Sequence, residues 1–197
     1  AFIKRDRKGS EAGLKYVLYG SVASGLMIYG ISLIYGMTGS LHLGAVAERL
    51  AVSGASEIGL IVAGILVFAG FAYKMAAFPM HLWAPDVYEG APIPFTAYLS
   101  VASKAAGFAV FVRFLMAFGA DFQGTVAEGG GAGAEVSFGW PEIVAMASVL
   151  SMTFGNLAAL WQENVKRMLA YSSVAHAGYL LMAVAVLMPG SPGAGQF

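Results

Sequence analysis

The chain has 197 residues, of which 58% are hydrophobic and only 11% are charged. Soluble globular domains carry about 25% charged residues, so this composition excludes a domain that is solvated on every side. Eleven basic and eleven acidic residues give a formal net charge of zero, which argues against nucleic acid as a partner. The chain has no cysteine and only three scattered histidines, so we expect it to hold no disulfide, iron–sulfur cluster, metal or other cofactor.

Five stretches are long and apolar enough for membrane-spanning helices, which need about 20 residues each. None of them alternates in the manner of a barrel strand. The sequence therefore predicts an all-α membrane protein and a single transmembrane fragment over residues 1–197. The predicted helices cover about residues 11–37, 58–88, 95–118, 141–161 and 168–188, and the second is expected to be broken at Pro79.

The predicted connections differ in character. A short surface helix is expected around residues 46–50, whereas residues 119–139 are rich in glycine and predict a flexible loop without packed structure. The chain starts at Ala1 without a methionine and stops soon after its last helix, which indicates an internal fragment of a longer chain.

The basic residues predict the orientation in the membrane. A basic run, Lys4–Lys8, precedes the first helix, and Lys166 and Arg167 precede the fifth. Five spans place these two segments on the same side, which we expect to be cytoplasmic.

Two lysines lie deep in apolar stretches. Lys74 is near the end of the second, and Lys104 is about nine residues or more from either end of the third. Inserting a lysine at the centre of a membrane helix costs about 2.5–3.5 kcal/mol, so two such lysines in neighbouring helices indicate a functional role. Snorkelling to the interface suits Lys15, one turn inside the first helix, but about 13 Å of helix is beyond the reach of Lys104. Because burial favours the neutral amine, a buried lysine can take up and release protons.

Other polar residues accompany these lysines. Pro79 follows Lys74 by five residues and predicts a helix break, and broken helices at membrane depth line wet cavities or are buried in protein. An ordinary proline kink is the alternative. His81 at the break and His176 in the fifth helix can titrate near neutral pH, but each can equally be a hydrogen-bonded packing residue. No carboxylate lies mid-span, so a partner for the lysines lies outside the chain or reaches in from Glu11, Asp86 or Glu89.

Two long segments resemble a known family. Residues 71–92 read FAYKMAAFPMHLWAPDVYEGAP, and residues 164–179 read NVKRMLAYSSVAHAGY. Both are similar to the antiporter-like subunits of respiratory complex I. The run PDVYEGAP, followed by VASK at residues 101–104, resembles the subunit N (subunit 2) family in particular.

The resemblance implies a fourteen-helix fold with inverted repeats, of which this chain would hold helices six to ten. Lys74 and Lys104 then match two proton-carrying lysines, and Lys15 matches a third lysine of the family. A gating glutamate and an exit lysine would lie outside the chain. The implied function is proton translocation across the cell (inner) membrane of a bacterium, driven by quinone reduction elsewhere. NADH, FMN, iron–sulfur clusters and quinone are expected to bind partner subunits. The expected neighbours of this chain are other membrane-arm subunits, especially antiporter-like and small membrane subunits.

Two alternatives remain open at this point. The same lysine and proline pattern occurs in multi-subunit cation/proton antiporters and in the membrane subunits of energy-converting hydrogenases. The second alternative is a membrane scaffold in which the lysines are paired permanently and carry no protons.

Overall fold

The computed structural model describes residues 7–52, 57–128 and 140–187, and every element in these ranges is helical. In chain order the elements are α1 (Arg7–Thr38), α2 (Leu43–Val52), α3 (Glu57–Met75), α4 (Trp83–Gly90), α5 (Ile93–Tyr98), the π-helical turn η1 (Leu99–Ser103), α6 (Lys104–Glu128), α7 (Trp140–Leu160) and α8 (Val165–Leu187).

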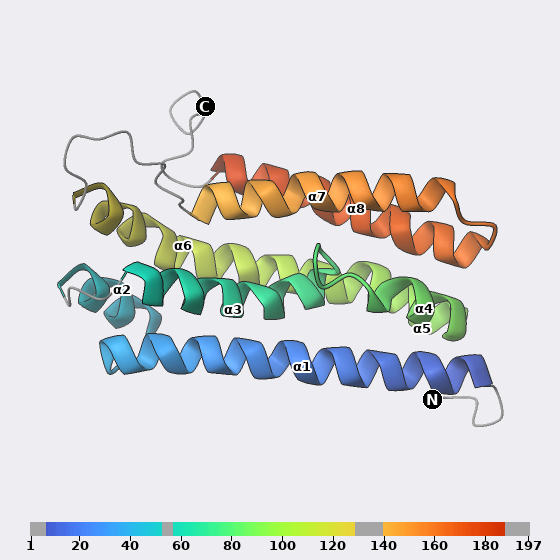
Figure 1. Cartoon of the computed structure of the whole chain (residues 1–197), viewed down its shortest axis with the longest axis horizontal. Helices are drawn as coiled ribbons and strands as arrows, with labels where there is room; N and C mark the ends of the chain where they lie inside the picture. Colours follow the sequence, from blue (N-terminus) through green and yellow to red (C-terminus); the bar gives the residue numbers. More distant parts are fainter. Residues whose placement is uncertain (1–6, 53–56, 129–139, 188–197) are drawn as a thin grey trace.

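Five segments of the described chain are long and apolar enough to cross a membrane, which confirms the predicted number. They are Arg7–Thr38, Ile58–Met75, Ile93–Met116, Pro141–Leu160 and Val165–Leu187. The long helices run along one common axis, with α7 and α8 on one side of the bundle, α1 on the other, and α3 and α6 between them (Figure 1).

The prediction for residues 119–139 is wrong in its first half, because α6 continues as a regular helix to Glu128. Only two of the ten residues from 119 to 128 are glycine. Each interior glycine costs about 1 kcal/mol, whereas extending an existing helix adds one hydrogen bond per residue without a new nucleation step. Residues 129–139 lie outside the described residues.

The core of the bundle is built around α3. Phe68 and Phe71 of α3 pack against the fully buried Phe111 of α6, with ring centroids 5.6 and 5.2 Å apart. On its other side α3 approaches α1 closely at Gly30, where an added Cβ would lie 2.7 Å from the carbonyl oxygen of Ala63. Small residues thus allow the close helix contacts that hold membrane bundles together.

The predicted break after Lys74 is confirmed, but it begins before the proline. Ala76 adopts a left-handed conformation with φ of 55°, and the N–H of Ala77 donates to the carbonyl of Ala72 at 2.8 Å. The N–H of Ala76 donates to the carbonyl of Tyr73 at 3.1 Å. This pair of bonds is a Schellman cap, so α3 ends at Met75 through its own cap.

The segment from Ala76 to Leu82 is fixed by neighbouring helices. The N–H of Phe78 donates to Ser151 Oγ of α7 at 2.8 Å, and the indole N–H of Trp83 donates to the carbonyl of Tyr73 at 3.2 Å. Trp83 also packs edge-on against Tyr16 of α1, with ring centroids 5.2 Å apart. The chain therefore resumes as α4 in a defined position between α1 and α8.

Candidate functional site

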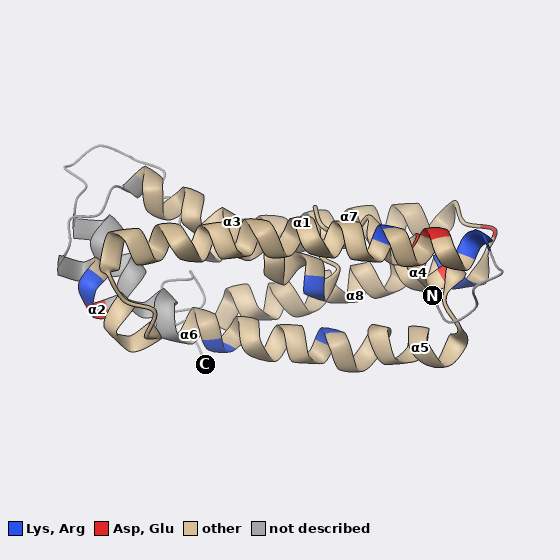
Figure 2. Ribbon diagram, turned by 90° about the horizontal axis from the view of Figure 1, so that it is seen from below, with Lys and Arg blue, Asp and Glu red and all other residues tan. Residues whose placement is uncertain are grey.

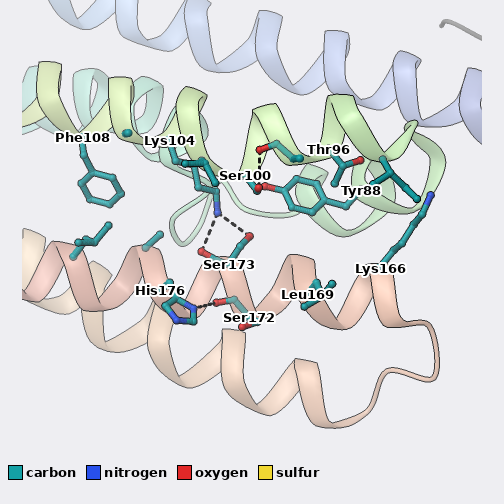
Figure 3. Close-up of a pocket in the computed structure, with 16 residues that line it drawn as sticks. Tyr88, Thr96, Ser100, Lys104, Phe108, Lys166, Leu169, Ser172, Ser173 and His176 are labelled. Atoms are coloured by element: carbon teal, nitrogen blue, oxygen red, sulfur yellow. Dashed lines mark hydrogen bonds between the residues drawn. The ribbon is translucent and has the colours of Figure 1, made fainter.

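Lys104 is the most buried lysine that the structure describes, with 7% of its surface exposed. It is the first residue of α6, directly after the π-helical turn η1. Single π-turns are rare in helices, and those that do occur are often found at functional sites. The extra residue in the turn changes the face on which the following side chains lie, and Lys104 here points towards α8 (Figure 3).

A single residue of α8 holds the Lys104 side chain. Lys104 Nζ donates to both the backbone carbonyl and the side-chain Oγ of Ser173, each at 2.9 Å. Ser173 Oγ in turn donates to the carbonyl of Ala170 at 2.7 Å. Sequence reasoning missed Ser173, because the two residues are 69 positions apart and only the packing of α6 against α8 shows the pair.

Lys104 lies in the wall of a cavity of about 700 Å³ between α4, α5, α6 and α8. Most of the lining is apolar. The polar lining side chains are those of Tyr88, Thr96, Ser100, Lys166, Ser172, Ser173 and His176, together with Lys104 itself. In Figure 3 Lys166 and Phe108 lie at opposite ends of the cavity, with Lys104 and Tyr88 between them. The cavity therefore extends from Lys104, near the middle of the Ile93–Met116 segment, to Lys166 at the end of the bundle (Figure 3).

Lys74 lies against α6 beside the same region. Its aliphatic stem packs on Gly107, one turn after Lys104, where an added Cβ would lie 3.0 Å from Lys74 Cγ. Lys74 is exposed and occupies the last turn of α3, a position where the helix dipole favours a cation. No hydrogen bond or ion pair to Lys74 is found within residues 7–52, 57–128 and 140–187.

The two histidines differ in their surroundings. His81 is buried at the break, where its ring stacks on Phe78 at 5.7 Å and its Nδ1 has no hydrogen-bond partner among the described residues. His176 is exposed, with Nδ1 2.8 Å from the carbonyl oxygen of Ser172, and it lines the Lys104 cavity. The structure therefore brings His176 near Lys104 and places His81 in the loop after Lys74.

Lys15 does not join the mid-membrane lysines. Its Nζ lies 2.6 Å from Asp86 and 2.7 Å from Glu11. Arg167 lies 2.5 Å from the other oxygen of Asp86 and 3.3 Å from Glu89. These five residues, with Lys8 at 2.9 Å from Glu89, are called the ionic cluster below. It ties α1, α4 and α8 together at one end of the bundle.

The ionic cluster corrects one expectation. Glu11, Asp86 and Glu89 were candidate partners for Lys74 or Lys104, but all three pair with residues at the end of the bundle. Figure 2 shows acidic and basic residues gathered where α4 lies, whereas isolated basic residues interrupt the middle of the bundle. A carboxylate partner for the two mid-membrane lysines is thus not found among the described residues.

The ionic cluster lowers the pKa of Asp86 and Glu89, its two acids that lie outside the spanning segments. Partial burial by itself raises the pKa of Asp86, but the hydrogen bonds and charges of Lys15 and Arg167 outweigh it and hold the pKa below its usual value. The hydrogen bond from Lys8, with a further one from Arg167, holds the pKa of Glu89 below its usual value. Both residues are therefore carboxylates at neutral pH.

Comparison with known proteins agrees with this geometry. Residues 1–193 match the family described as "NADH:quinone oxidoreductase/Mrp antiporter, TM". The chain is 52% identical to NADH-quinone oxidoreductase subunit N 2 of Chloroherpeton thalassium and 51% identical to subunit N of Chlorobium chlorochromatii. Each alignment covers 94% of this chain but 35% of the relative, so the chain spans about a third of the length of the curated relatives it matches.

Solved structures show the same fold. A chain of respiratory complex I from Thermus thermophilus with bound aureothin is 37% identical, with a TM-score of 0.72 over 92% of this chain and 35% of that one. A chain of the archaeal membrane-bound sulfane sulfur reductase is 30% identical, with a TM-score of 0.75 over 92% of this chain and 34% of the other. Since the family match covers nearly the whole sequence, the chain belongs to the NADH:quinone oxidoreductase/Mrp antiporter transmembrane family.

Proposed function

We propose that this chain is part of a subunit N-type membrane-arm subunit that translocates protons through Lys74 and Lys104. The observation that carries the proposal is Lys104, a buried lysine whose Nζ is held by Ser173 and lies in the wall of a cavity. Such a group can exist as ammonium or as amine at mid-membrane depth, where a permanently charged side chain is costly.

The contact between Lys74 and Gly107 supports a path between the two lysines. Lys74 lies beside a helix break and Lys104 faces the cavity, so Lys74 acts as the uptake residue and Lys104 as the relay. Lys15 belongs to the ionic cluster, which makes it a structural cation in this proposal. His81 and His176 are assigned secondary roles, as a polar group at the break and a cavity-lining base.

The driving reaction takes place elsewhere in this proposal. NADH, FMN, iron–sulfur clusters and quinone bind partner subunits, and quinone reduction there drives rearrangement of charges along the membrane arm. The neighbours are further antiporter-like and small membrane subunits in the cell (inner) membrane of a bacterium, with Lys4–Lys8 and Lys166–Arg167 on the cytoplasmic side.

Replacement of Lys104 in the full-length subunit tests the proposal. Lys104→Ala and Lys104→Arg are compared in the assembled complex in inverted membrane vesicles. Arginine keeps a charge and hydrogen-bond donors but does not release a proton. We expect both variants to assemble and both to lose proton pumping, measured by quenching of a ΔpH-sensitive dye during NADH oxidation.

The alternatives give different results. A structural scaffold predicts that Lys104→Arg pumps normally and that Lys104→Ala weakens assembly. A cation/proton antiporter, favoured by the similarity to the Mrp-type family, predicts exchange of protons against sodium in vesicles without NADH. The higher identity to subunit N relatives, 52% against 30% for the sulfane sulfur reductase chain, supports the NADH-quinone oxidoreductase assignment.

A further inference from the structure

The hydrogen bonds of Lys104 have a particular stoichiometry. An ammonium carries three N–H donors and a neutral amine carries two. Both bonds that Lys104 Nζ makes within the described residues go to one residue, Ser173, through its carbonyl oxygen and its Oγ. The ammonium form therefore has one N–H beyond the two that bond to Ser173, whereas the two N–H groups of the amine form match these two bonds.

Resting on the proposed proton transfer through Lys104, we propose that Ser173 is a catalytic residue that selects and directs the proton that Lys104 gives up. The third N–H, which is not bonded to Ser173, transfers its proton to a water molecule or another base in the cavity. The electron pair of that bond stays on nitrogen as a lone pair in the same direction. The two remaining N–H groups keep their bonds to Ser173, so the amine nitrogen stays in the same place and orientation until it binds the next proton.

Ser173 is itself held in the orientation that it needs to accept the hydrogen bond from Lys104. Its hydroxyl proton is used in the 2.7 Å bond to the carbonyl of Ala170, which leaves the lone pairs of Oγ available for Lys104. Arg167, six residues earlier on α8, is fixed by its ion pair with Asp86. The helix that carries Ser173 is therefore anchored near the ionic cluster and cannot rotate freely about its axis.

Several titratable groups face Lys104 from the elements around it. Tyr88 faces it from α4, Lys166 and His176 line the same cavity from α8, and Lys74 packs one turn away against α6. None of them is a carboxylate, and the serine hydroxyl is the side-chain group that accepts a hydrogen bond from Lys104 in the described part of the chain. Loss of this hydroxyl should therefore change both the rate and the pH dependence of proton transfer.

The experiment compares Ser173→Ala, Ser173→Thr and Ser172→Ala in the full-length subunit of the assembled complex. Ser172 lines the same cavity, but its backbone carbonyl, not its hydroxyl, makes its contact with His176. The typical net contribution of one hydrogen bond predicts that Ser173→Ala pumps protons about threefold to tenfold more slowly. We expect its pH profile to be displaced, whereas Ser173→Thr and Ser172→Ala keep the wild-type rate and profile.

Two results overturn the inference. One is a Ser173→Ala variant that pumps like Ser172→Ala, and the other is a Ser173→Thr variant that loses as much as Ser173→Ala, since threonine retains the hydroxyl. A parallel Lys104→Ala variant separates this inference from the proposed function. Full pumping without Lys104 overturns the proposed function, whereas lost pumping without Lys104 and normal pumping without the Ser173 hydroxyl overturns only the role of Ser173.

Discussion

Asp86 receives hydrogen bonds from Lys15 on α1 and Arg167 on α8, and so joins three helices through one carboxylate. Removing one partner from a partly buried ion pair leaves the remaining charges without compensation. Asp86 is 29% exposed and Glu89 is 19% exposed, so solvent screens these pairs only in part. The short helix α4, which has eight residues and no side-chain cap at its start, depends on these contacts for its position.

The lowered pKa of Asp86 predicts a pH-dependent contribution to stability. A carboxyl group whose pKa is lower in the folded state stabilises that state above its unfolded pKa of about 4. This contribution is lost as the pH falls through the lower, folded pKa. We therefore expect Asp86→Asn to lower the melting temperature of the assembled complex at neutral pH, and the difference from wild type to shrink as the pH falls below about 4.

Thermal denaturation of the assembled complex between neutral and acidic pH measures this difference. Glu11→Gln is the matched control, because Glu11 pairs with the same Lys15 but lies on the same helix and is 63% exposed. A difference between Asp86→Asn and wild type that stays constant across the pH range would contradict an ionic role of Asp86.

At the scale of single residues, the sequence predicted the position of the buried Lys104 but not its partner. An unpaired lysine in an apolar stretch is visible in the sequence because it is costly in lipid. The partner Ser173 is one of several serines, and nothing local distinguishes it from Ser172. The acids of the ionic cluster were one of two possible sources of a partner for Lys74 or Lys104, and the sequence could not predict their actual partners because these depend on how α1 and α8 pack.

At the scale of elements, the helix break shows what local sequence can and cannot predict. Pro79 cannot continue a helix, so a break near it follows from the sequence. The break begins earlier because Ala76 takes the left-handed position of a Schellman cap, which is normally glycine. This conformation costs alanine about 1–2 kcal/mol. Contacts with α7 offset this cost, such as the hydrogen bond that the Phe78 N–H donates to Ser151 Oγ.

The pair of helices α7 and α8 carries an element-scale prediction. At Gly155 of α7 an added Cβ would lie 2.7 Å from the backbone nitrogen of Ala175 on α8. Backbone atoms cannot move aside singly, so Gly155→Ala has to push the helices apart. Overpacking of this kind costs about 1–3 kcal/mol. Because α8 carries Ser173, we expect less assembled complex and slower proton pumping per assembled complex.

Gly25→Ala on α1 is the matched control, since a Cβ at Gly25 meets nothing within 4 Å in the described residues. Assembly is measured by the amount of complex extracted from membranes, and pumping by dye quenching normalised to that amount. Gly155→Ala with unchanged assembly and unchanged pumping would contradict the proposed dependence of the Lys104 site on α7–α8 packing.

At the scale of the whole molecule, the bundle has two unequal ends. Lys8, Lys166 and Arg167 lie at one end with the ionic cluster. At the other end Arg49 of α2 donates to the carbonyl of Thr38 at the end of α1, about 48 Å of helix away from Arg7. The sequence alone predicted that the first and fifth helices begin on the same side, and the ion pairs among α1, α4 and α8 support this placement.

The unequal ends predict which loop faces the cytoplasm. Loops rich in lysine and arginine stay on the cytoplasmic side during insertion, so the turn between α7 and α8 should be cytoplasmic and the segment between α1 and α2 should be on the opposite side. The chain has no cysteine, so Glu163→Cys and His42→Cys each introduce a single thiol into this segment. Both positions are exposed in the structure. A membrane-impermeant maleimide should label Glu163→Cys in inverted vesicles and His42→Cys in right-side-out vesicles. The reversed pattern would place the ionic cluster on the outer face and would contradict the orientation expected from the basic residues.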